Sequence, residues 1–382
     1  MNPDRWLRDD LRRMEPYTPI VPFEVLSARL GRPAAEIVKL DANENPYGPP
    51  PGALAALAAG RSYHIYPDPE ANALREALSR FTGQPQARLL AGMGADELID
   101  LVLRAVLEPG DVVIDCPPTF GMYAFSTAIN GGRAVTVPRG PDFSLDLAAI
   151  EAAVANEPRA KVLFVCSPNN PDGGVVDDAA LRRLLALPLL VVLDEAYVEF
   201  AAAEGFPSRI GWTAAHDNLV VLRTFSKLAG LAGLRVGYGA FPDWLLLHLW
   251  KIKQPYNVNV AASLAAVAAL EDGDWLRQTV GRLVVERERM AREVAALGWL
   301  RPLPSRANFV LCRVAGRPAA EVKRALEAEG VLVRYFDKPG LRDCIRISAG
   351  RPEDTDRLLE VLKKESPQIT QISQIGEESS AD

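Results

Sequence analysis

The segment LVVLRTFSKLAGLAGLRVG, which begins at Leu219, constrains the fold of this chain more than any other. An apolar run of strand length is followed there by Thr224, Ser226 and Lys227, and then by Arg235. A single lysine after a strand is usually solvated, so Lys227 alone carries little weight. Two hydroxyls and a guanidinium nearby change this interpretation, because arginine binds phosphate through two parallel hydrogen bonds and short hydroxyls add donors. The segment therefore predicts a buried strand that ends at a phosphate site, with a lysine beside it.

A lysine beside a bound phosphate suggests a phosphorylated cofactor that is held covalently. Pyridoxal phosphate requires this set: a lysine for a Schiff base, a phosphate site, and a carboxylate that keeps the pyridine nitrogen protonated. A second apolar run, Leu189 to Leu193, ends in Asp194, and Tyr197 follows three residues later. We expect Asp194 to pair with the pyridinium and Tyr197 to reach the phenolic oxygen of the cofactor.

A third apolar run and a glycine-bearing turn supply further polar groups. Val162 to Val165 leads into a turn that carries Asn170. Because ligands bind at the carboxyl ends of strands in open α/β sheets, the residues after the three runs are expected to converge. The turn LLAGMGADE contains Gly94, Ala95 and Asp96 and precedes an amphipathic helix, so its free backbone N–H groups favour a phosphate.

Ordered motifs from Pro16 to Lys363 carry a family resemblance. They are DANENPYGPP, YPDP, GMGADE, PPTFGMY, SPNNP, LDEAY, RTFSK, the arginine at 235, and IRISAG. In this order they resemble the pyridoxal-phosphate aminotransferases of fold type I, classes I and II, and within that group they are most similar to the histidinol-phosphate aminotransferases. The resemblance implies transamination of L-histidinol phosphate with 2-oxoglutarate, which gives imidazole acetol phosphate and glutamate in histidine biosynthesis.

The resemblance also implies roles around the cofactor. Lys227 would form the Schiff base and then act as the general base, after burial and the cationic cofactor have lowered its pKa. Asp194 would hold the ring nitrogen protonated, and Tyr197 with Asn170 would bond the phenolic oxygen. Phe120 stands where the family usually carries a tyrosine stacked on the ring, so stacking is kept and a hydroxyl is lost.

Substrate roles rest on the same resemblance, each beside a plainer alternative. Tyr66 would reach the phosphate of the neighbour's cofactor in a homodimer with shared active sites, or would be an aromatic residue of a turn. Tyr17 would form a wall of the substrate site or pack in an N-terminal arm, and Asn45 would lie near the substrate carboxylate or belong to a turn. Arg346 would bind the substrate carboxylate or form the solvated face of an edge strand, and Arg334 would help to hold the substrate phosphate.

Alternating strands and helices predict an α/β fold. We expect a large domain with a mostly parallel central sheet covered by helices on both faces, and a smaller α+β C-terminal domain. The expected division is an N-terminal arm at 1–45, the large domain at 46–258, the small domain at 259–364 and a disordered tail at 365–382.

Individual elements are also predicted from periodicity and end signals. A helix is expected from Glu70 to Phe81, with Gly83 as its end signal, and a long helical region from Ala261 toward Leu297. The segment from Asn43 to Pro51 is too rich in Pro, Gly and Asn for anything but ordered loop.

Composition narrows the classes of partner. The chain has 382 residues and a net charge of −6, so no basic surface for nucleic acid or an anionic membrane is expected. The four cysteines and three histidines lack metal-ligand spacing, so no metal site is predicted. The first residues contain no apolar core of a secretory signal, and no apolar run approaches membrane-spanning length, which favours a cytoplasmic location.

Three other functions use the same residues. An aromatic-amino-acid aminotransferase would differ only in its substrate pocket, and a threonine-phosphate decarboxylase would be a lyase that releases carbon dioxide. A binding module that only retains the fold is a third alternative, and intact Lys227 and Asp194 argue against it.

Overall fold

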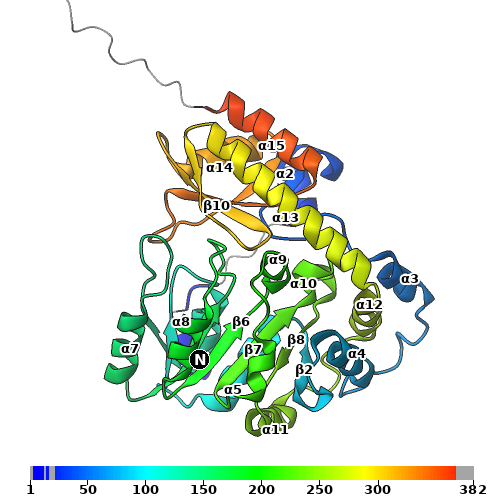
Figure 1. The fold of residues 1–382 in the computed structure, drawn as a ribbon, viewed down its shortest axis with the longest axis vertical. Helices are drawn as coiled ribbons and strands as arrows, with labels where there is room; N and C mark the ends of the chain where they lie inside the picture. Colours follow the sequence, from blue (N-terminus) through cyan, green and yellow to red (C-terminus); the bar gives the residue numbers. More distant parts are fainter. Residues whose placement is uncertain (1–2, 13, 17–21, 367–382) are drawn as a thin grey trace, which may run out of the picture.

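The computed structural model of the protein describes residues 3–12, 14–16 and 22–366. Their strands form a sheet of seven and a sheet of five strands. In Figure 1 the larger sheet and its helices lie below the smaller sheet, and the long helix α13 (Gly273–Ala296) runs beside both. Tyr17 lies outside the described residues, as does the predicted tail from residue 367 on.

The larger sheet has the strand order β2-β8-β7-β6-β5-β3-β4. Neighbouring strands from β7 to β4 run parallel, whereas β8 is antiparallel to both β2 and β7. The central strands β5, β6 and β7 are nearly continuous apolar runs because both faces of the sheet are covered. The predicted mostly parallel sheet is confirmed. Its strands are β2 (Leu89–Gly92), β3 (Val112–Asp115), β4 (Arg133–Thr136), β5 (Ala160–Cys166), β6 (Leu190–Asp194), β7 (Leu219–Thr224) and β8 (Gly237–Ala240).

Two apolar clusters cover the faces of this sheet. Alternate residues of β5 point to opposite faces, so Phe164 packs in one cluster and Leu163 in the other. Helices α5 (Ala95–Val106), α6 (Met122–Ile129) and α11 (Asp243–Ile252) supply the first cluster. The second receives residues from α3 (Pro51–Ala59), α4 (Asn72–Thr82), α7 (Leu147–Asn156), α8 (Asp178–Leu185), α12 (Val260–Glu271) and α13.

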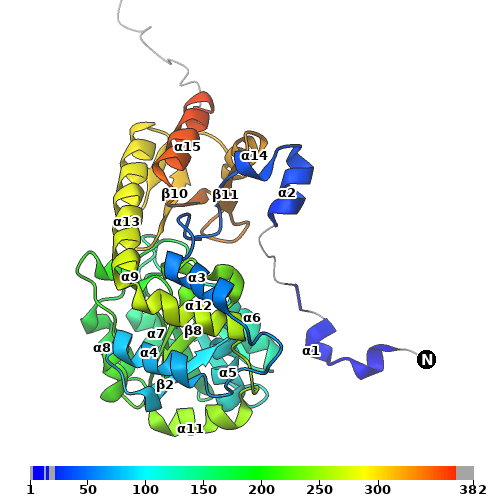
Figure 2. The same cartoon turned by 90° about the vertical axis from the view of Figure 1, so that its right-hand side faces the viewer.

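The smaller sheet has the strand order β1-β11-β12-β10-β9. Only the β1–β11 pair among these neighbours is parallel. Helices α13, α14 (Ala319–Ala328) and α15 (Pro352–Lys364) pack on it, as Figures 1 and 2 show. The N-terminal part of the chain therefore gives this sheet an edge strand. The strands are β1 (Val38–Leu40), β9 (Leu300–Pro302), β10 (Phe309–Val314), β11 (Val331–Tyr335) and β12 (Cys344–Ser348).

The region predicted as one long helix is two helices. Asp272 separates them, and its side chain caps α13 by accepting a hydrogen bond from the Trp275 N–H at 3.3 Å. Leu283 in the first half of α13 packs with the larger sheet, and Met290 packs with the smaller one. Because α12 also packs with the larger sheet, the boundary after residue 258 stays a prediction.

One helix was missed in the Pro-rich segment. The loop predicted up to Pro51 ends there, and α3 begins with that residue in its first turn, where a missing N–H costs nothing. Shorter helices and 3₁₀ turns complete the fold. They are α1 (Asp9–Arg12), α2 (Phe23–Leu30), α9 (Val198–Ala202), α10 (Phe225–Leu228), and the turns at Pro3–Trp6, Ala34–Glu36, Gln86–Arg88, Ile210–Ala214 and Ala232–Leu234.

Over the described part of the chain, none of the helices combines the length and the apolar character needed to cross a bilayer.

Candidate active site

Asn170, Asp194 and Lys227 lie at or just after the carboxyl ends of β5, β6 and β7. Arg346 of β12 donates from Nη1 to Asn170 Oδ1 at 2.5 Å and from Nη2 to the Asp41 carbonyl at 2.7 Å. Lys227 Nζ donates to the Ala42 carbonyl at 3.0 Å. The site therefore lies between the two sheets, and the loop after β1 closes one side of it.

Lys227 lies in α10, a single helical turn that begins directly after β7. Thr224 caps this turn, because its hydroxyl accepts a hydrogen bond from the Ser226 N–H at 3.1 Å. Burial lowers the pKa of the Lys227 ammonium to about 8, and the nearby Arg346 cation acts in the same direction. A substantial fraction of this amine is therefore neutral near pH 8, as a Schiff-base lysine and general base requires.

Asp194 ends β6 and is only 3% exposed. One of its oxygens accepts a hydrogen bond from the Tyr123 hydroxyl at 2.6 Å, and the other accepts one from the Ala196 N–H at 3.0 Å. Burial raises the pKa of Asp194 to about 6 against these two neutral donors. A carboxylate in this state is stabilised by any cation placed beside it, such as a protonated ring nitrogen.

Tyr123 is a site residue that the sequence analysis missed. It is fully buried in α6 and its ring stacks on Phe164 with centroids 4.5 Å apart. Phe120, three residues earlier, meets the Tyr123 ring edge-on at 5.6 Å. The motif PPTFGMY contains both aromatic residues, and a buried tyrosine needs a partner for its hydroxyl. That requirement is the signal that could have linked Tyr123 to a buried carboxylate.

Tyr197 is buried and its hydroxyl oxygen accepts a hydrogen bond from Asn43 Nδ2 at 3.0 Å. Asn43, like Tyr123, was not among the predicted site residues. The predicted Asn45 is also buried, but its amide bonds the backbone: Nδ2 donates to the Leu228 carbonyl at 3.1 Å and Oδ1 accepts from the Tyr47 N–H at 3.0 Å. Asn45 therefore holds the loop against α10.

The residues predicted to form a phosphate cradle are brought close together by the pairing of β2, β8 and β7. Gly237 of β8 is in register with Gly92 at the end of β2 and with Thr224 at the end of β7. Gly94 has φ +80°, and a Cβ there would lie 2.7 Å from Arg235 Nη2. Only glycine therefore fits this turn without displacing the guanidinium.

An ion pair lies beside these residues. Arg235 Nη2 pairs with Asp96 Oδ2 at 3.2 Å, and both side chains are nearly half exposed. Ala95 opens α5, whose first N–H groups face the same turn. The hydroxyls of Thr224 and Ser226 bond each other at 3.0 Å, so the turn after β7 carries two hydroxyls and the turn before α5 lies against the Arg235 guanidinium.

Arg334 and Arg346 are directly opposite each other on β11 and β12. The interpretation of Arg346 as the solvated face of an edge strand is wrong, because β12 is the central strand of its sheet and Arg346 is 5% exposed. Both guanidiniums lie over the Phe336 ring, at 5.4 Å for Arg334 and 5.5 Å for Arg346. Like charges opposite each other in a sheet are unfavourable, so this pair is suited to an anion.

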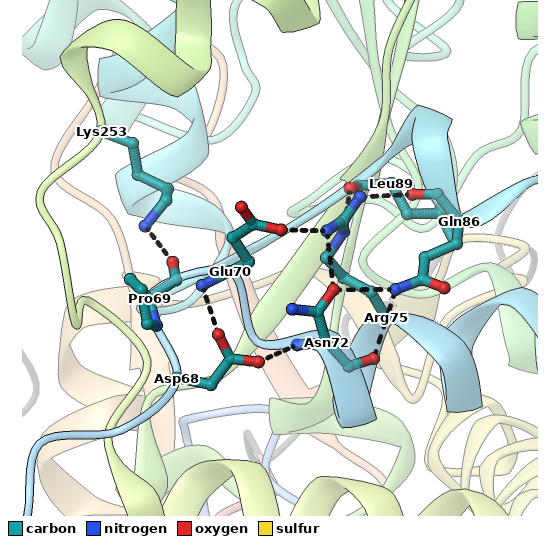
Figure 3. A network of polar contacts seen from close by, with 8 residues as sticks. All are labelled: Asp68, Pro69, Glu70, Asn72, Arg75, Gln86, Leu89 and Lys253. Atoms are coloured by element: carbon teal, nitrogen blue, oxygen red, sulfur yellow. Dashed lines mark hydrogen bonds and ion pairs between the residues drawn. The ribbon is translucent and has the colours of Figure 1, made fainter.

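Tyr66 is 78% exposed and stacks on Tyr256 with centroids 4.7 Å apart. The loop that carries it is held at its other end by the network in Figure 3. Asp68 accepts hydrogen bonds from the Asn72 N–H at the start of α4, at 2.8 Å, and from the Glu70 N–H in the turn before it, at 3.0 Å. Lys253 Nζ donates to the Pro69 carbonyl at 2.9 Å. The loop is therefore fixed while its tyrosine points into solvent.

These residues fit pyridoxal phosphate. Asp194 is a buried carboxylate, and a cationic ring nitrogen beside it would lower its raised pKa. Lys227 is an amine with a lowered pKa. Gly94 lies against Arg235 and leaves the room that a phosphate needs. In the ranges 3–12, 14–16 and 22–366, no group of three or more His, Cys, Asp or Glu side chains is arranged to hold a metal ion.

Comparisons with known proteins identify the family of this chain. Residues 35–362 match the family model of aminotransferase class I and II. The chain is 54% identical to a histidinol-phosphate aminotransferase of Roseiflexus castenholzii, over 94% of this chain and 97% of that protein. It is 52% identical to the chloroplastic histidinol-phosphate aminotransferase of Nicotiana tabacum, over 94% of this chain and 86% of that protein.

A solved structure is similar over nearly the whole chain. The histidinol-phosphate aminotransferase of Sinorhizobium meliloti, in complex with pyridoxal-5'-phosphate, superimposes with a TM-score of 0.84. It is 33% identical, and the match covers 93% of this chain and 96% of that one.

Proposed function

This chain belongs to the class I and II aminotransferases, and we infer from its site and its relatives that it transfers the amino group of L-histidinol phosphate. It uses pyridoxal phosphate and acts in histidine biosynthesis. The second substrate in this proposal is 2-oxoglutarate, and the products are imidazole acetol phosphate and glutamate. The observation that carries the substrate class is the pair of arginines, Arg334 and Arg346, which are opposite each other on adjacent strands, with Arg346 close enough to Lys227 to lower its pKa.

Pyridoxal phosphate, when bound, supplies an electron sink that stabilises negative charge at the substrate's alpha carbon. The chain's own residues supply orientation and proton transfer. Asp194 would pair with the cationic ring nitrogen, and Tyr123 holds the carboxylate in place through its 2.6 Å hydrogen bond. Lys227, with a pKa of about 8, is the group that holds the cofactor and moves the proton at the alpha carbon.

The arginine pair favours a phosphorylated substrate over an aromatic amino acid. Two guanidiniums match the charge of a phosphate monoester, which is close to −2 at neutral pH and has three acceptor oxygens. A dicarboxylate such as 2-oxoglutarate presents two carboxylates and suits the same pair. One site with two arginines can therefore serve both halves of a transamination.

A test of this substrate class follows the absorbance of the purified holoenzyme during addition of histidinol phosphate, phenylalanine or threonine phosphate. We expect the visible cofactor band to bleach at the lowest concentration with histidinol phosphate. Arg334→Ala should raise that concentration for histidinol phosphate and leave the value for phenylalanine nearly unchanged. If phenylalanine bleaches the band at a lower concentration than histidinol phosphate does, the preference for a phosphorylated substrate is refuted. If threonine phosphate releases carbon dioxide without an amino acceptor, the protein is a threonine-phosphate decarboxylase.

The proposal includes a homodimer with shared active sites and a cytoplasmic location. Large apolar side chains are exposed on the segments around Tyr66, which is the surface expected of an interface between copies. They are Leu54, Tyr63, Ile65, Tyr66, Met93, Tyr256 and Leu264. Tyr66 at the centre of such an interface would reach the partner's cofactor phosphate.

Mixed dimers test the shared site. Lys227→Ala and Tyr66→Ala remove residues that would belong to different chains of one site. After unfolding and refolding of an equal mixture, half of the dimers carry one of each chain, and one of their two sites is intact. We expect recovery of about one quarter of the wild-type activity. If the mixture is no more active than the sum of its parents, Tyr66 acts within its own chain or not at all.

A further inference from the structure

Asn43 lies at the centre of the loop that follows β1. It is 1% exposed and has φ +54°, a left-handed conformation that asparagine tolerates better than most residues. Every polar group of Asn43 has a partner. A buried residue in this conformation, bonded through both its amide and its backbone, is held in one orientation.

The partners of Asn43 come from both sheets. On the side of the smaller sheet, Ser348 Oγ accepts from the Asn43 N–H at 2.8 Å and donates to Asn43 Oδ1 at 2.9 Å. Asn308 Nδ2 donates to the Asn43 carbonyl at 3.0 Å. On the side of the larger sheet, Asn43 Nδ2 donates to the Tyr197 hydroxyl oxygen at 3.0 Å. One side chain therefore joins β12 to the tyrosine that follows β6.

The serine determines which way the amide of Asn43 faces. Because Ser348 donates to Oδ1, the NH₂ group of the amide must point to Tyr197, and the tyrosine oxygen must accept. The single hydrogen of the Tyr197 hydroxyl is then available to a different acceptor. The hydroxyl is thereby set as a donor before any ligand arrives.

We propose that Asn43 is a positioning residue, which orients the Tyr197 hydroxyl as a hydrogen-bond donor to the cofactor's phenolic oxygen and links that donor to the strand carrying Arg346. This inference rests on the proposed role of Tyr197. The charged and titratable groups that face the Tyr197 hydroxyl are Arg346 of β12, Cys166 of β5 and Asp194 of β6. None of them acts through the amide of Asn43, so the contribution of the amide can be isolated.

The linkage has a spectroscopic consequence. A donor to the phenolic oxygen stabilises negative charge there, and so lowers the apparent pKa at which the visible absorbance of the bound cofactor changes. An amide that donates to the tyrosine oxygen makes the tyrosine hydrogen a better donor, since hydrogen bonds in a chain strengthen one another. Removal of the amide should therefore raise that apparent pKa.

The first test is Asn43→Gly, because glycine adopts φ +54° without strain and lacks the amide. We expect the apparent pKa of the cofactor absorbance to rise by a few tenths of a unit, which is a fraction of the rise of about 0.5 to 1 unit expected when Tyr197→Phe removes the whole hydrogen bond. In a Tyr197→Phe background the same substitution should produce no further rise. An equal rise in both backgrounds overturns the inference, as does no rise in either.

A matched control and a second variant separate positioning from stability. Asn130→Ala removes an amide that also makes two hydrogen bonds, to Asp100 Oδ1 at 2.8 Å and the Ser126 carbonyl at 2.9 Å, and it should not move the pKa. Ser348→Ala keeps Asn43 and should give a smaller rise in the same direction. An unchanged pKa in Ser348→Ala overturns the link to β12.

The outcome also distinguishes this inference from the proposed function. If the wild-type protein binds the cofactor but Tyr197→Phe leaves the apparent pKa unchanged, the role of Tyr197 fails and the inference fails with it. If Tyr197→Phe raises the pKa and Asn43→Gly does not, only the inference fails. The unfolding midpoint of each protein without cofactor, measured beside these spectra, reports how much stability each variant has lost.

Discussion

Replacement of the buried carboxylate of Asp194 should make the cofactor-free protein more stable at alkaline pH. The reason is that Asp194 is 3% exposed and only the neutral donors Tyr123 and Ala196 bond it. Burial raises its pKa from 3.8 to about 6, so its ionised form is disfavoured in the folded chain. Asp194→Asn keeps the shape and removes the charge.

The magnitude follows from linkage. The rise from 3.8 to about 6 is about two pH units, and each unit corresponds to about 1.4 kcal/mol, which gives about 3 kcal/mol. Because the folded pKa is the higher one, the folded protein binds the proton more tightly between pH 4 and pH 6. Stability is therefore lost as the pH rises through that window and stays lost above it.

The amide has only one acceptor oxygen, so if that oxygen keeps the Ala196 N–H, the NH₂ group faces Tyr123 and the hydrogen bond that Tyr123 donates is lost, at a cost of about 1 kcal/mol. Asp194→Asn should consequently be more stable than the wild type by about 2 kcal/mol at pH 8 and less stable by about 1 kcal/mol at pH 4. The sign of the difference reverses between the two pH values.

Denaturant unfolding of both proteins without cofactor, at pH 4 and pH 8, measures this difference. Addition of pyridoxal phosphate at pH 8 should then stabilise the wild type more than the variant, because only the wild type offers a carboxylate to the ring nitrogen. Asp111→Asn is the matched control. Its carboxyl bonds Lys161 and Arg159, its pKa is lowered to about 2, and its loss should destabilise the protein at pH 8. A difference for Asp194→Asn that does not change with pH refutes the argument.

Three further substitutions test other parts of the site. Arg346→Lys should raise KM for histidinol phosphate about 10- to 100-fold with a smaller effect on kcat, because lysine cannot form the guanidinium fork; steady-state kinetics measure it. Gly94→Ala should weaken cofactor binding about tenfold in a spectroscopic titration, because its Cβ would lie 2.7 Å from Arg235 Nη2. The control is Gly233→Ala, whose Cβ would have no neighbouring atom within 4 Å, so this variant should bind the cofactor normally. Asp68→Ala should destabilise the protein by about 1 kcal/mol in denaturant unfolding, because the N–H groups of Asn72, the first residue of α4, and of Glu70 in the turn before it lose their acceptor.

The sequence predicted the fold best where periodicity and end signals agreed. The helix predicted for 70–81 is α4 at Asn72–Thr82, and Gly83 ends it with φ +71°. The missed helix α3 has almost no amphipathic pattern, since it is mostly alanine and leucine, so only its first-turn proline marked it. The break at Asp272 was missed because a cap residue between two helical patterns resembles a polar position on one helix.

Site residues were predictable where chemistry dictated the residue type. Asp194 ends β6, Lys227 lies in the turn after β7, and Arg235 comes just before β8, so each is placed by a strand end that the sheet sets, and a linear pattern was enough to predict them. Tyr123 and Asn43 act through partners 71 and 154 residues away in the sequence. The local sequence can mark such a residue but does not give its role, because that role depends on which side chain the fold places opposite it.

Three features of the site lower the stability of the folded chain when cofactor and substrate are absent. A buried Asp194 disfavours its ionised form, Lys227 disfavours its protonated form, and Arg334 faces Arg346 across a strand pair. A different group stabilises each of these side chains. A cationic ring nitrogen would stabilise the ionised Asp194, a covalent bond to the carbonyl carbon of the cofactor would replace the charge of Lys227, and a substrate anion would stabilise the arginine pair. The cofactor should therefore stabilise the folded chain through Asp194 and Lys227, whereas a phosphate or dicarboxylate should stabilise it further only through the arginine pair. Unfolding midpoints with cofactor alone and with cofactor plus inorganic phosphate would separate the two contributions, and Arg334→Ala should abolish only the second.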